Sequence, residues 1–286
     1  LTLSAPVRFV AKSGAEPVLD INKVDPGITF SDGRQMLDGF TVVNGRTHAL
    51  RFYSGSCMRN CTVQNLQNVI GGTSAYFILV SGSTVSNCVF RGATSAYAYS
   101  DPVVQLSGAS LVSDCLFENM ENLDTVAYVD GEKSVVPNCI FRNSPMSSVG
   151  GNLRYQAITL VSGLVTHCVI TNFGGTGSTG TGDKSYGGVV SIIGDKATLR
   201  NCLIADCSAK VNAGIDIQNG AVENCTVVGG KLAATASGSQ RNLKQTGGRV
   251  VNSIFWNDSG IDGVTVSVSA ADALLVGAIE VKNGGV

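Results

Sequence analysis

Histidine and cysteine are the side chains in this sequence that could ligate a metal ion or act as a base near neutral pH. His167 and Cys168 are adjacent, and such a pair could supply two metal ligands. Asn or Asp precedes the Cys at most other places where this local pattern occurs. We therefore expect His167 to be a polar corner residue. His48 has no acidic or Cys partner at ligand spacing and is expected to be a surface residue.

Three carboxylates, Asp124, Asp130 and Glu132, lie close together in the sequence and could bind Ca²⁺ through oxygen ligands. Asp130 directly precedes Gly131 at the end of an alternating apolar segment, where Asp commonly bonds to the backbone of a turn. We interpret Asp130 as a turn residue, and we expect no metal ion or other cofactor. Ca²⁺ enters only with the enzyme hypothesis given below.

The Gly-rich segment 174–185 contains the spacing Gly175-x-Gly177-x-x-Gly180, which is close to that of a phosphate-binding loop. Asp183 separates Gly182 from Lys184, and the residues that follow read as a strand rather than as a helix whose N-terminus could hold a phosphate. We interpret the segment as an insertion that lengthens one repeat and could contact a partner.

The composition excludes several classes of protein. Hydrophobic residues make up 44% of the 286 residues, which is enough to form a core and excludes a disordered chain. The net charge of -1 lacks the clustered Lys and Arg that nucleic acids require. No run of 18 apolar residues exists, so we expect no membrane span. The chain starts at Leu1 without a signal segment, and we expect it to be a piece of a longer protein.

Seven of the nine cysteines mark an internal repeat in which Asn, Asp or His precedes Cys and an aliphatic residue or Phe follows two positions later. These cysteines are Cys61, Cys88, Cys115, Cys139, Cys168, Cys202 and Cys225. At the two ends we place the small residues Gly39 and Ser253 in the Cys slot. The 214 residues between these two cover eight repeats, a mean of about 27 residues, which indicates a solenoid.

Each repeat contains an alternating segment that ends in a small polar residue and Gly, a second short apolar segment, and the Cys segment. A unit of three short strands cannot bury its own apolar face, but stacked units form one continuous core. The sequence therefore predicts an all-β parallel β-helix of about nine to ten coils. We expect one domain over 1–286, with a partial coil at 1–27, regular coils at 28–257 and C-terminal strands at 258–286. Stacked cysteines form a line, which favours buried thiols over a metal site.

The repeat resembles the right-handed β-helix repeats of pectate-lyase-like and polymorphic-outer-membrane-protein-like bacterial proteins. The resemblance is carried by Gly39-Phe40-Thr41-Val42, the Asn-Cys-x-Phe repeats and the segment Asn252-Ser253-Ile254-Phe255-Trp256-Asn257. It implies a right-handed solenoid but no single activity, because this fold hosts lyases, hydrolases, adhesins and phage fibres.

The enzymes of this fold imply one hypothesis, a polysaccharide lyase or glycoside hydrolase with clustered carboxylates and a basic residue. Its candidate residues are Asp101, Asp124 and Glu132, with Lys133 or Arg154 as the base or charge stabiliser. The outward positions of the first strand in each coil argue against a catalytic cluster. They include Arg51 and Asp216 about six coils apart, or roughly 29 Å, which is too far for the two to cooperate.

The favoured hypothesis is a non-catalytic module for adhesion, glycan binding or filament assembly, secreted or on a bacterial surface. Its partner would be a glycan or a cell-surface molecule, and open solenoid ends would permit end-to-end association of identical chains. The candidate binding face consists of Arg51, Tyr53, Gln105, Tyr128, Thr159 and Asp216.

Overall fold

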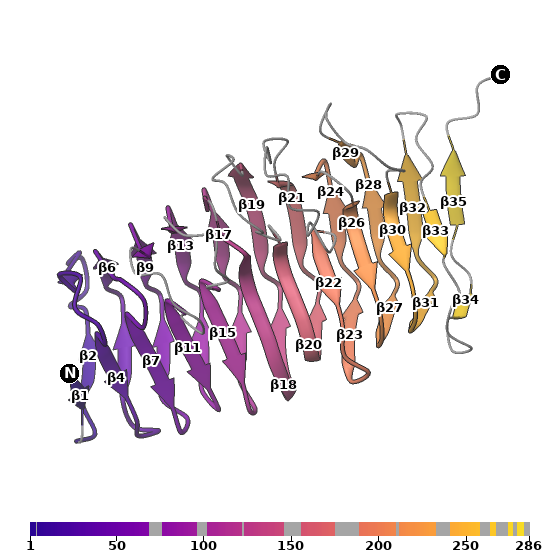
Figure 1. Cartoon of the computed structure of the whole chain (residues 1–286). Helices are drawn as coiled ribbons and strands as arrows, with labels where there is room; N and C mark the ends of the chain where they lie inside the picture. The colour runs from indigo at the N-terminus through magenta and orange to yellow at the C-terminus, as the bar shows by residue number, and fades with distance from the viewer. Residues whose placement is uncertain are drawn as a thin grey trace.

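The computed structural model describes residues 1–3, 5–68, 76–95, 102–121, 123–145, 156–174, 189–209, 212–232, 241–257, 264–266, 274–276 and 279–282. Asp101, Arg154 and residues 175–185 of the Gly-rich segment lie outside these ranges. Within them the regular structure consists of strands, without a helix (Figure 1).

The strands form three parallel ladders, two of which belong to one continuous sheet. The first ladder contains β1 (Thr2–Leu3), β4 (Ile28–Phe30), β7 (Leu50–Tyr53), β11 (Ile78–Ser81), β15 (Val104–Ser107), β18 (Thr125–Pro137), β20 (Gln156–Thr166), β22 (Val190–Ile192), β26 (Asn212–Ile217), β30 (Arg241–Gln245) and β33 (Val264–Val266). The second contains β2 (Arg8–Val10), β5 (Met36–Asp38), β8 (Cys57–Arg59), β12 (Thr84–Ser86), β16 (Leu111–Ser113), the later parts of β18 and β20, β23 (Ala197–Arg200), β27 (Ala221–Glu223), β31 (Arg249–Val251) and β34 (Leu274–Val276).

The third ladder forms the opposite wall of the solenoid. It contains β3 (Val18–Asp20), β6 (Thr41–Val43), β9 (Thr62–Gln64), β13 (Val89–Arg91), β17 (Leu116–Glu118), β19 (Ile140–Pro145), β21 (Val169–Gly174), β24 (Leu203–Ala205), β28 (Thr226–Val228), β32 (Ile254–Asn257) and β35 (Ile279–Lys282). Short strands β10 (Gln67–Asn68), β14 (Thr94–Ser95), β25 (Ser208–Ala209) and β29 (Lys231–Leu232) extend some coils.

These ladders confirm the predicted parallel β-helix. Each ladder has eleven levels in the described residues, more than the nine to ten coils predicted, because residues 1–20 and 264–282 each supply a full set of three strands. The coils stack into a rod with β1 at one end and β35 at the other (Figure 1). Its core is a stack of inward-facing apolar side chains, since alternate residues of every strand point inside.

The corners of the coils contain residues with a left-handed backbone, which Asn and Gly tolerate better than other residues. At the corner before the third ladder, Asn60, Asn87, Asp114, Asn138, His167, Asn201, Asn224 and Asn252 all have φ between 49° and 57°. Their side chains bond from coil to coil, as Asn87 Nδ2 does to Asn60 Oδ1 at 2.7 Å. His167 Nε2 lies 3.1 Å from Asn201 Nδ2, so His167 is a member of this corner ladder.

A second corner ladder follows the third strand of each coil and was not predicted. Asn65, Asn119, Asn143, Asn172 and Asp206 have φ between 49° and 58°, and Gly92 and Gly229 also have positive φ. Each of these residues comes four positions after a repeat cysteine, so the spacing was available in the sequence. Asn172 Nδ2 donates to Asn143 Oδ1 at 2.9 Å, which shows the same bonding between coils.

The seven repeat cysteines are buried, and all nine cysteines are free thiols. At the C-terminal end the prediction was right, since Ile254 pairs with Thr226 and Ser253 therefore occupies the slot of Cys225. At the N-terminal end it was wrong by one residue. Thr41 pairs with Thr62, so Phe40 stands in the slot of Cys61 and Gly39 stands in the corner slot of Asn60. Gly39 has a φ of 81°, which suits the corner.

Cys57 and Cys207 are the two cysteines that do not belong to the repeat. Cys57 is half-buried on β8, and Cys207 is buried. Burial raises the pKa of the Cys207 thiol to about 12, and burial is also the main reason that the pKa of Cys57 is raised. Neither thiol therefore has the thiolate character that makes a cysteine reactive.

We expect the Cys139→Ser variant to remain folded with a loss of no more than about 1.5 kcal/mol, because serine already fills this slot at Ser253. There the hydroxyl donates to the Val251 carbonyl at 2.9 Å and accepts from the Cys225 amide at 3.2 Å. Cys139→Leu should cost about 1–3 kcal/mol through overpacking. Urea unfolding measures the free energy of unfolding of both variants. Equal losses for serine and leucine would contradict the inference that this buried position accepts small side chains better than large ones.

Candidate functional site

The outward row is the set of side chains that point away from the core at the centre of each first-ladder strand. The register places Arg51 beside Leu79, Leu79 beside Gln105 and Gln105 beside Tyr128. It continues through Thr159, Ser191 and Asp216 to Lys244. Arg51 and Asp216 are six steps apart, roughly 29 Å at ~4.8 Å per coil. The row divides into a half-buried N-terminal part and a buried C-terminal part.

In the N-terminal part, Arg51, Gln105 and Tyr128 are half-buried and Leu79 is 9% exposed. Tyr53 comes two residues after Arg51, faces outward on the same strand and starts a neighbouring line with Ser81 and Ser107. These residues present hydrogen-bonding groups together with flat aromatic rings. Such a mixture is typical of surfaces that bind polar ligands with some apolar faces.

Arg51 is held by a cluster of tyrosines. The Tyr76 hydroxyl is hydrogen-bonded to both Tyr53 and Arg51, and burial is the main reason that its pKa lies above the usual value. The Arg51 Nε is buried and has no hydrogen-bond partner, and no carboxylate in the described residues pairs with this guanidinium. A buried donor without an acceptor is costly in a free protein, so the Arg51 side chain is incompletely satisfied by the protein itself.

His48 extends the cluster and corrects the expectation that it has no acidic partner. Its Nδ1 lies 3.1 Å from Asp25 Oδ1, and Asp25 Oδ2 also accepts from the Thr47 hydroxyl at 3.2 Å. The His48 ring meets Tyr76 edge to face, with the ring centroids 4.6 Å apart. Asp25 belongs to the preceding coil, which is why sequence spacing did not reveal the pair.

In the C-terminal part, Thr159, Ser191 and Asp216 are 2%, 4% and 0% exposed. The Gln156 side chain bonds to both hydroxyls, accepting from Thr159 Oγ1 at 2.5 Å and donating to Ser191 Oγ. Lys244 on β30 is the register partner of Asp216, and its Nζ lies 3.4 Å from Asp216 Oδ2. Sequence reasoning missed Lys244, although Leu243-Lys244-Gln245 precedes a Gly pair in the way that other first strands precede their Gly.

The described candidates of the enzyme hypothesis do not converge. Asp124 is 8% exposed and directly precedes β18, whereas Glu132 lies beyond the bend of that strand. Six residues of extended chain separate Asp124 from Asp130, about 20 Å. Glu132 is exposed and pairs with Lys196, Lys133 is exposed next to it, and Asp130 accepts from the Ser162 hydroxyl at 3.2 Å. Three or more His, Cys, Asp or Glu side chains do not gather into a metal-binding group anywhere in the described residues.

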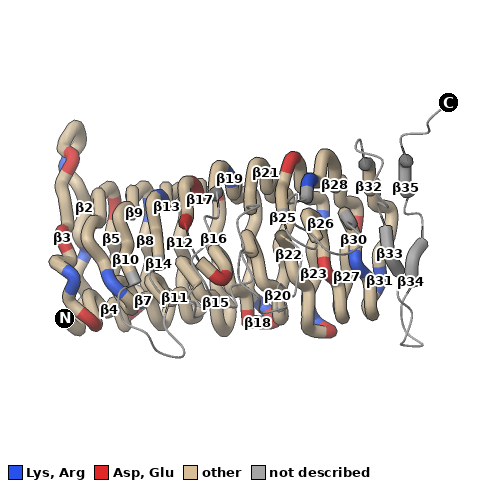
Figure 2. Tube along the Cα trace, turned by 45° about the horizontal axis from the view of Figure 1, so that its top comes forward, with Lys and Arg blue, Asp and Glu red and all other residues tan. Residues whose placement is uncertain are grey.

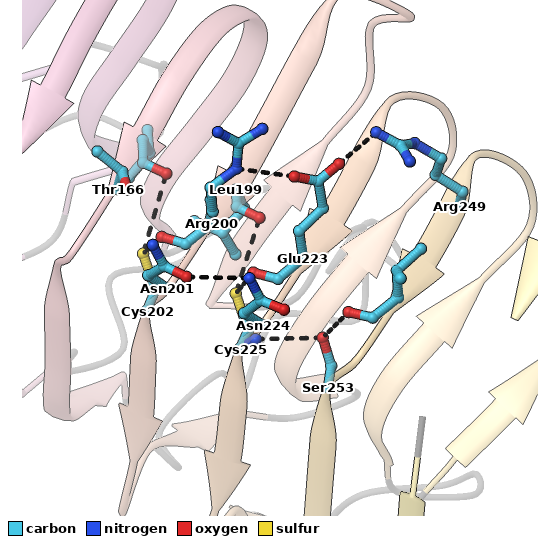
Figure 3. A network of polar contacts seen from close by, with 12 residues as sticks. Thr166, Leu199, Arg200, Asn201, Cys202, Glu223, Asn224, Cys225, Arg249 and Ser253 are labelled. Carbon is cyan, nitrogen blue, oxygen red and sulfur yellow. Dashed lines mark hydrogen bonds and ion pairs between the residues drawn. The ribbon is translucent and has the colours of Figure 1, made fainter. Parts of the chain in front are cut away.

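Charged residues are sparse along the coils (Figure 2). Several of them form ion pairs between neighbouring coils. Arg200 Nε donates to Glu223 Oε2 at 2.7 Å, and Arg249 pairs with the other oxygen of the same carboxylate (Figure 3). Figure 3 also shows the Asn201–Asn224 corner bond and the Ser253 slot beside Cys225. Because these arginines are about half exposed, their ion pairs contribute little to stability. Both guanidinium groups already have a carboxylate partner in Glu223, so this edge is a weaker candidate site than the outward row.

The chain was compared with known protein families, curated proteins and solved structures. No protein-family model and no curated protein matches the chain. Similar solved structures include the tailspike of E. coli bacteriophage HK620 in complex with a pentasaccharide, at 10% identity over 95% of this chain with a TM-score of 0.44. A PL6 family polysaccharide lyase from Pseudopedobacter saltans shares 12% identity over 98% of this chain and 86% of its own, with a TM-score of 0.45.

The catalytic unit of a GH87 α-1,3-glucanase from Streptomyces thermodiastaticus shares 11% identity over 96% of this chain, with a TM-score of 0.45. The chain spans 58% of the tailspike chain and 62% of the glucanase chain. At such identities and scores the likeness assigns no activity to this chain. The described residues contain no helix with the length and apolar character needed to cross a bilayer.

Proposed function

We propose that this protein is a non-catalytic glycan-binding module. The binding surface is the N-terminal part of the outward row, formed by Arg51, Gln105 and Tyr128 together with Tyr53 and Tyr76. The single observation that carries the proposal is the half-buried Arg51 side chain, which lies beside tyrosines and pairs with no carboxylate of the described residues. Tyrosine rings pack against the apolar faces of sugars, and the guanidinium and amide groups bond to sugar oxygens.

The spacing of the row supports a polymeric ligand. Neighbouring row positions repeat at the strand spacing of ~4.8 Å, which is comparable to the length of one sugar residue in an extended glycan. Hydrogen-bonding side chains at Arg51, Gln105 and Tyr128 would meet successive parts of such a chain. The enzyme alternative has less support, because a glycosidase needs two carboxylates on either side of one bond. Asp124 lies at the start of β18, whereas Glu132 lies beyond the bend of that strand and pairs with Lys196.

The experiment is a titration of the protein with oligosaccharides from pectin, alginate, β-glucan and mannan. We expect at least one to bind, and we expect Arg51→Gln to weaken that binding at least about tenfold, since it removes a charge-assisted donor. Arg200→Gln is the matched control, because Arg200 lies on the paired edge, and it should leave the affinity unchanged. Absence of binding by the wild-type protein, or turnover of any of these glycans, would contradict the proposal.

The proposal places the module outside the cell or on a bacterial surface, where polymeric glycans are accessible. The end-to-end association of chains stays a prediction. It rests on the unpaired strand edges at the two ends of a solenoid. Native mass measured over a range of concentrations tests it, and a constant monomeric mass would exclude it.

A further inference from the structure

The ion pair between Asp216 and Lys244 differs from the other ion pairs of the described residues. In those pairs the acidic side chain is between 11% and 62% exposed, whereas the Asp216 side chain is 1% exposed. The less exposed carboxylates each have two partners, as Asp38 has in Arg59 and Asn60. Asp216 has one contact, at 3.4 Å, and its Oδ1 has no hydrogen-bond partner.

Such a carboxylate is poorly compensated for its burial. A charge-assisted hydrogen bond normally measures about 2.7–2.9 Å, and a buried carboxylate normally satisfies both oxygens. Burial raises the pKa of the Asp216 carboxyl above its usual value, and Lys244 offsets part of that rise. The neutral, protonated form of the carboxyl is therefore easier to populate at this position than at an exposed aspartate.

The backbone holds the two side chains in a fixed relation. Asp216 lies on β26 and Lys244 on β30, and the two residues are direct register partners in parallel strands of successive coils. Both side chains point to the outside of the same sheet, and the flexible Lys244 stem can bring its nitrogen to the Asp216 carboxyl carbon without backbone movement. Preorganisation of this kind greatly lowers the entropic barrier of a reaction between two groups.

We propose that Lys244 and Asp216 condense into an intramolecular amide that links these two coils covalently. The ammonium of Lys244 first transfers one proton to the carboxylate. The amine lone pair then forms the bond between Nζ and Cγ, and one carboxyl oxygen leaves as water with that proton and a second proton from the nitrogen. The overall reaction joins an ammonium and a carboxylate into one neutral amide and one water, and it needs no oxidant or other reactant.

The amide removes the buried charge of Asp216 and the half-buried charge of Lys244. It leaves one carbonyl and one N–H in place of a carboxylate with an unpartnered oxygen, and their desolvation is less costly. It also closes a loop between residues 216 and 244, which restricts the unfolded chain in the same way as a disulfide.

Intact-mass spectrometry of the purified chain tests this inference. We expect the wild-type protein to be lighter than its sequence by the mass of one water, and Lys244→Arg to have its full mass. Lys244→Arg keeps the positive charge beside Asp216, so it also serves as a folding control. A full mass for the wild-type protein would overturn the proposal.

A tryptic digest locates the lost water. An acylated Lys244 is not cleaved by trypsin, so the peptide 211–231 should remain joined to the peptide 242–249. Asp-Gly sequences such as Asp32-Gly33 and Asp130-Gly131 could also lose water by forming a cyclic imide. Loss of water that persists in Lys244→Arg, or separate peptides in the wild-type digest, would therefore refute the amide.

Discussion

Phe117→Ala should destabilise the protein by about 3–5 kcal/mol, the usual cost of removing a fully buried aromatic side chain. Phe117 is 1% exposed and stacks between Phe90 and Phe141, with both centroid distances 4.7 Å and the rings within 7° of parallel. Alanine would leave a cavity that the two neighbouring rings cannot fill, because each is fixed by its own coil. Urea unfolding followed by circular dichroism measures the loss.

The control is Leu116→Ala on the same strand. Leu116 is half-buried on the outward face, so its truncation should cost no more than about 1 kcal/mol. The comparison separates the stacked core from the surface of one strand. Equal losses for the two variants would show that the phenylalanine stack is not a principal source of stability in these coils.

The repeat could be predicted because its physical causes are local. A left-handed corner favours Asn or Gly at a fixed place, and the buried slot beside it favours a small side chain such as Cys. Both appear in the sequence at nearly constant spacing, so the fold and the outward row followed from the pattern. The alignment failed at Gly39 because a glycine suits the corner slot and the small-residue slot equally well, and only the pairing of Thr41 with Thr62 decides between them.

The candidate site was harder to predict, because its contacts join residues from different coils. Asp25 reaches His48, and Tyr76 reaches Arg51, from neighbouring coils. Insertions make the distance between equivalent residues vary, so spacing alone does not show which side chains meet. The sequence pattern also did not show how deeply each position of the outward row is buried. Gln105 and Asp216 occupy equivalent row positions, yet one is half-buried and the other is fully buried.

Gly174→Ala should destabilise the protein by about 2–6 kcal/mol, combining backbone strain with overpacking. Gly174 is the first residue of the Gly-rich segment and ends β21, where it pairs with both Pro145 and Ser208. Its φ is 95°, and a Cβ there would lie 1.8 Å from the Ser208 carbonyl oxygen. Because that oxygen belongs to the backbone of the next coil, it cannot move away without breaking the ladder. Thermal and urea unfolding measure the loss.

Gly82→Ala provides the matched control, because it isolates the cost of the backbone conformation. Gly82 has a φ of 59°, and a Cβ there would meet nothing within 4 Å. We expect a loss of about 1–2 kcal/mol from the left-handed conformation alone. If Gly174→Ala cost no more than Gly82→Ala, close approach of the next coil would not be the reason for this glycine. A larger loss at Gly174 would show that this glycine is needed for close packing of two coils. The first glycine of the Gly-rich segment would then have a structural role, although the glycine spacing of that segment is close to that of a phosphate-binding loop.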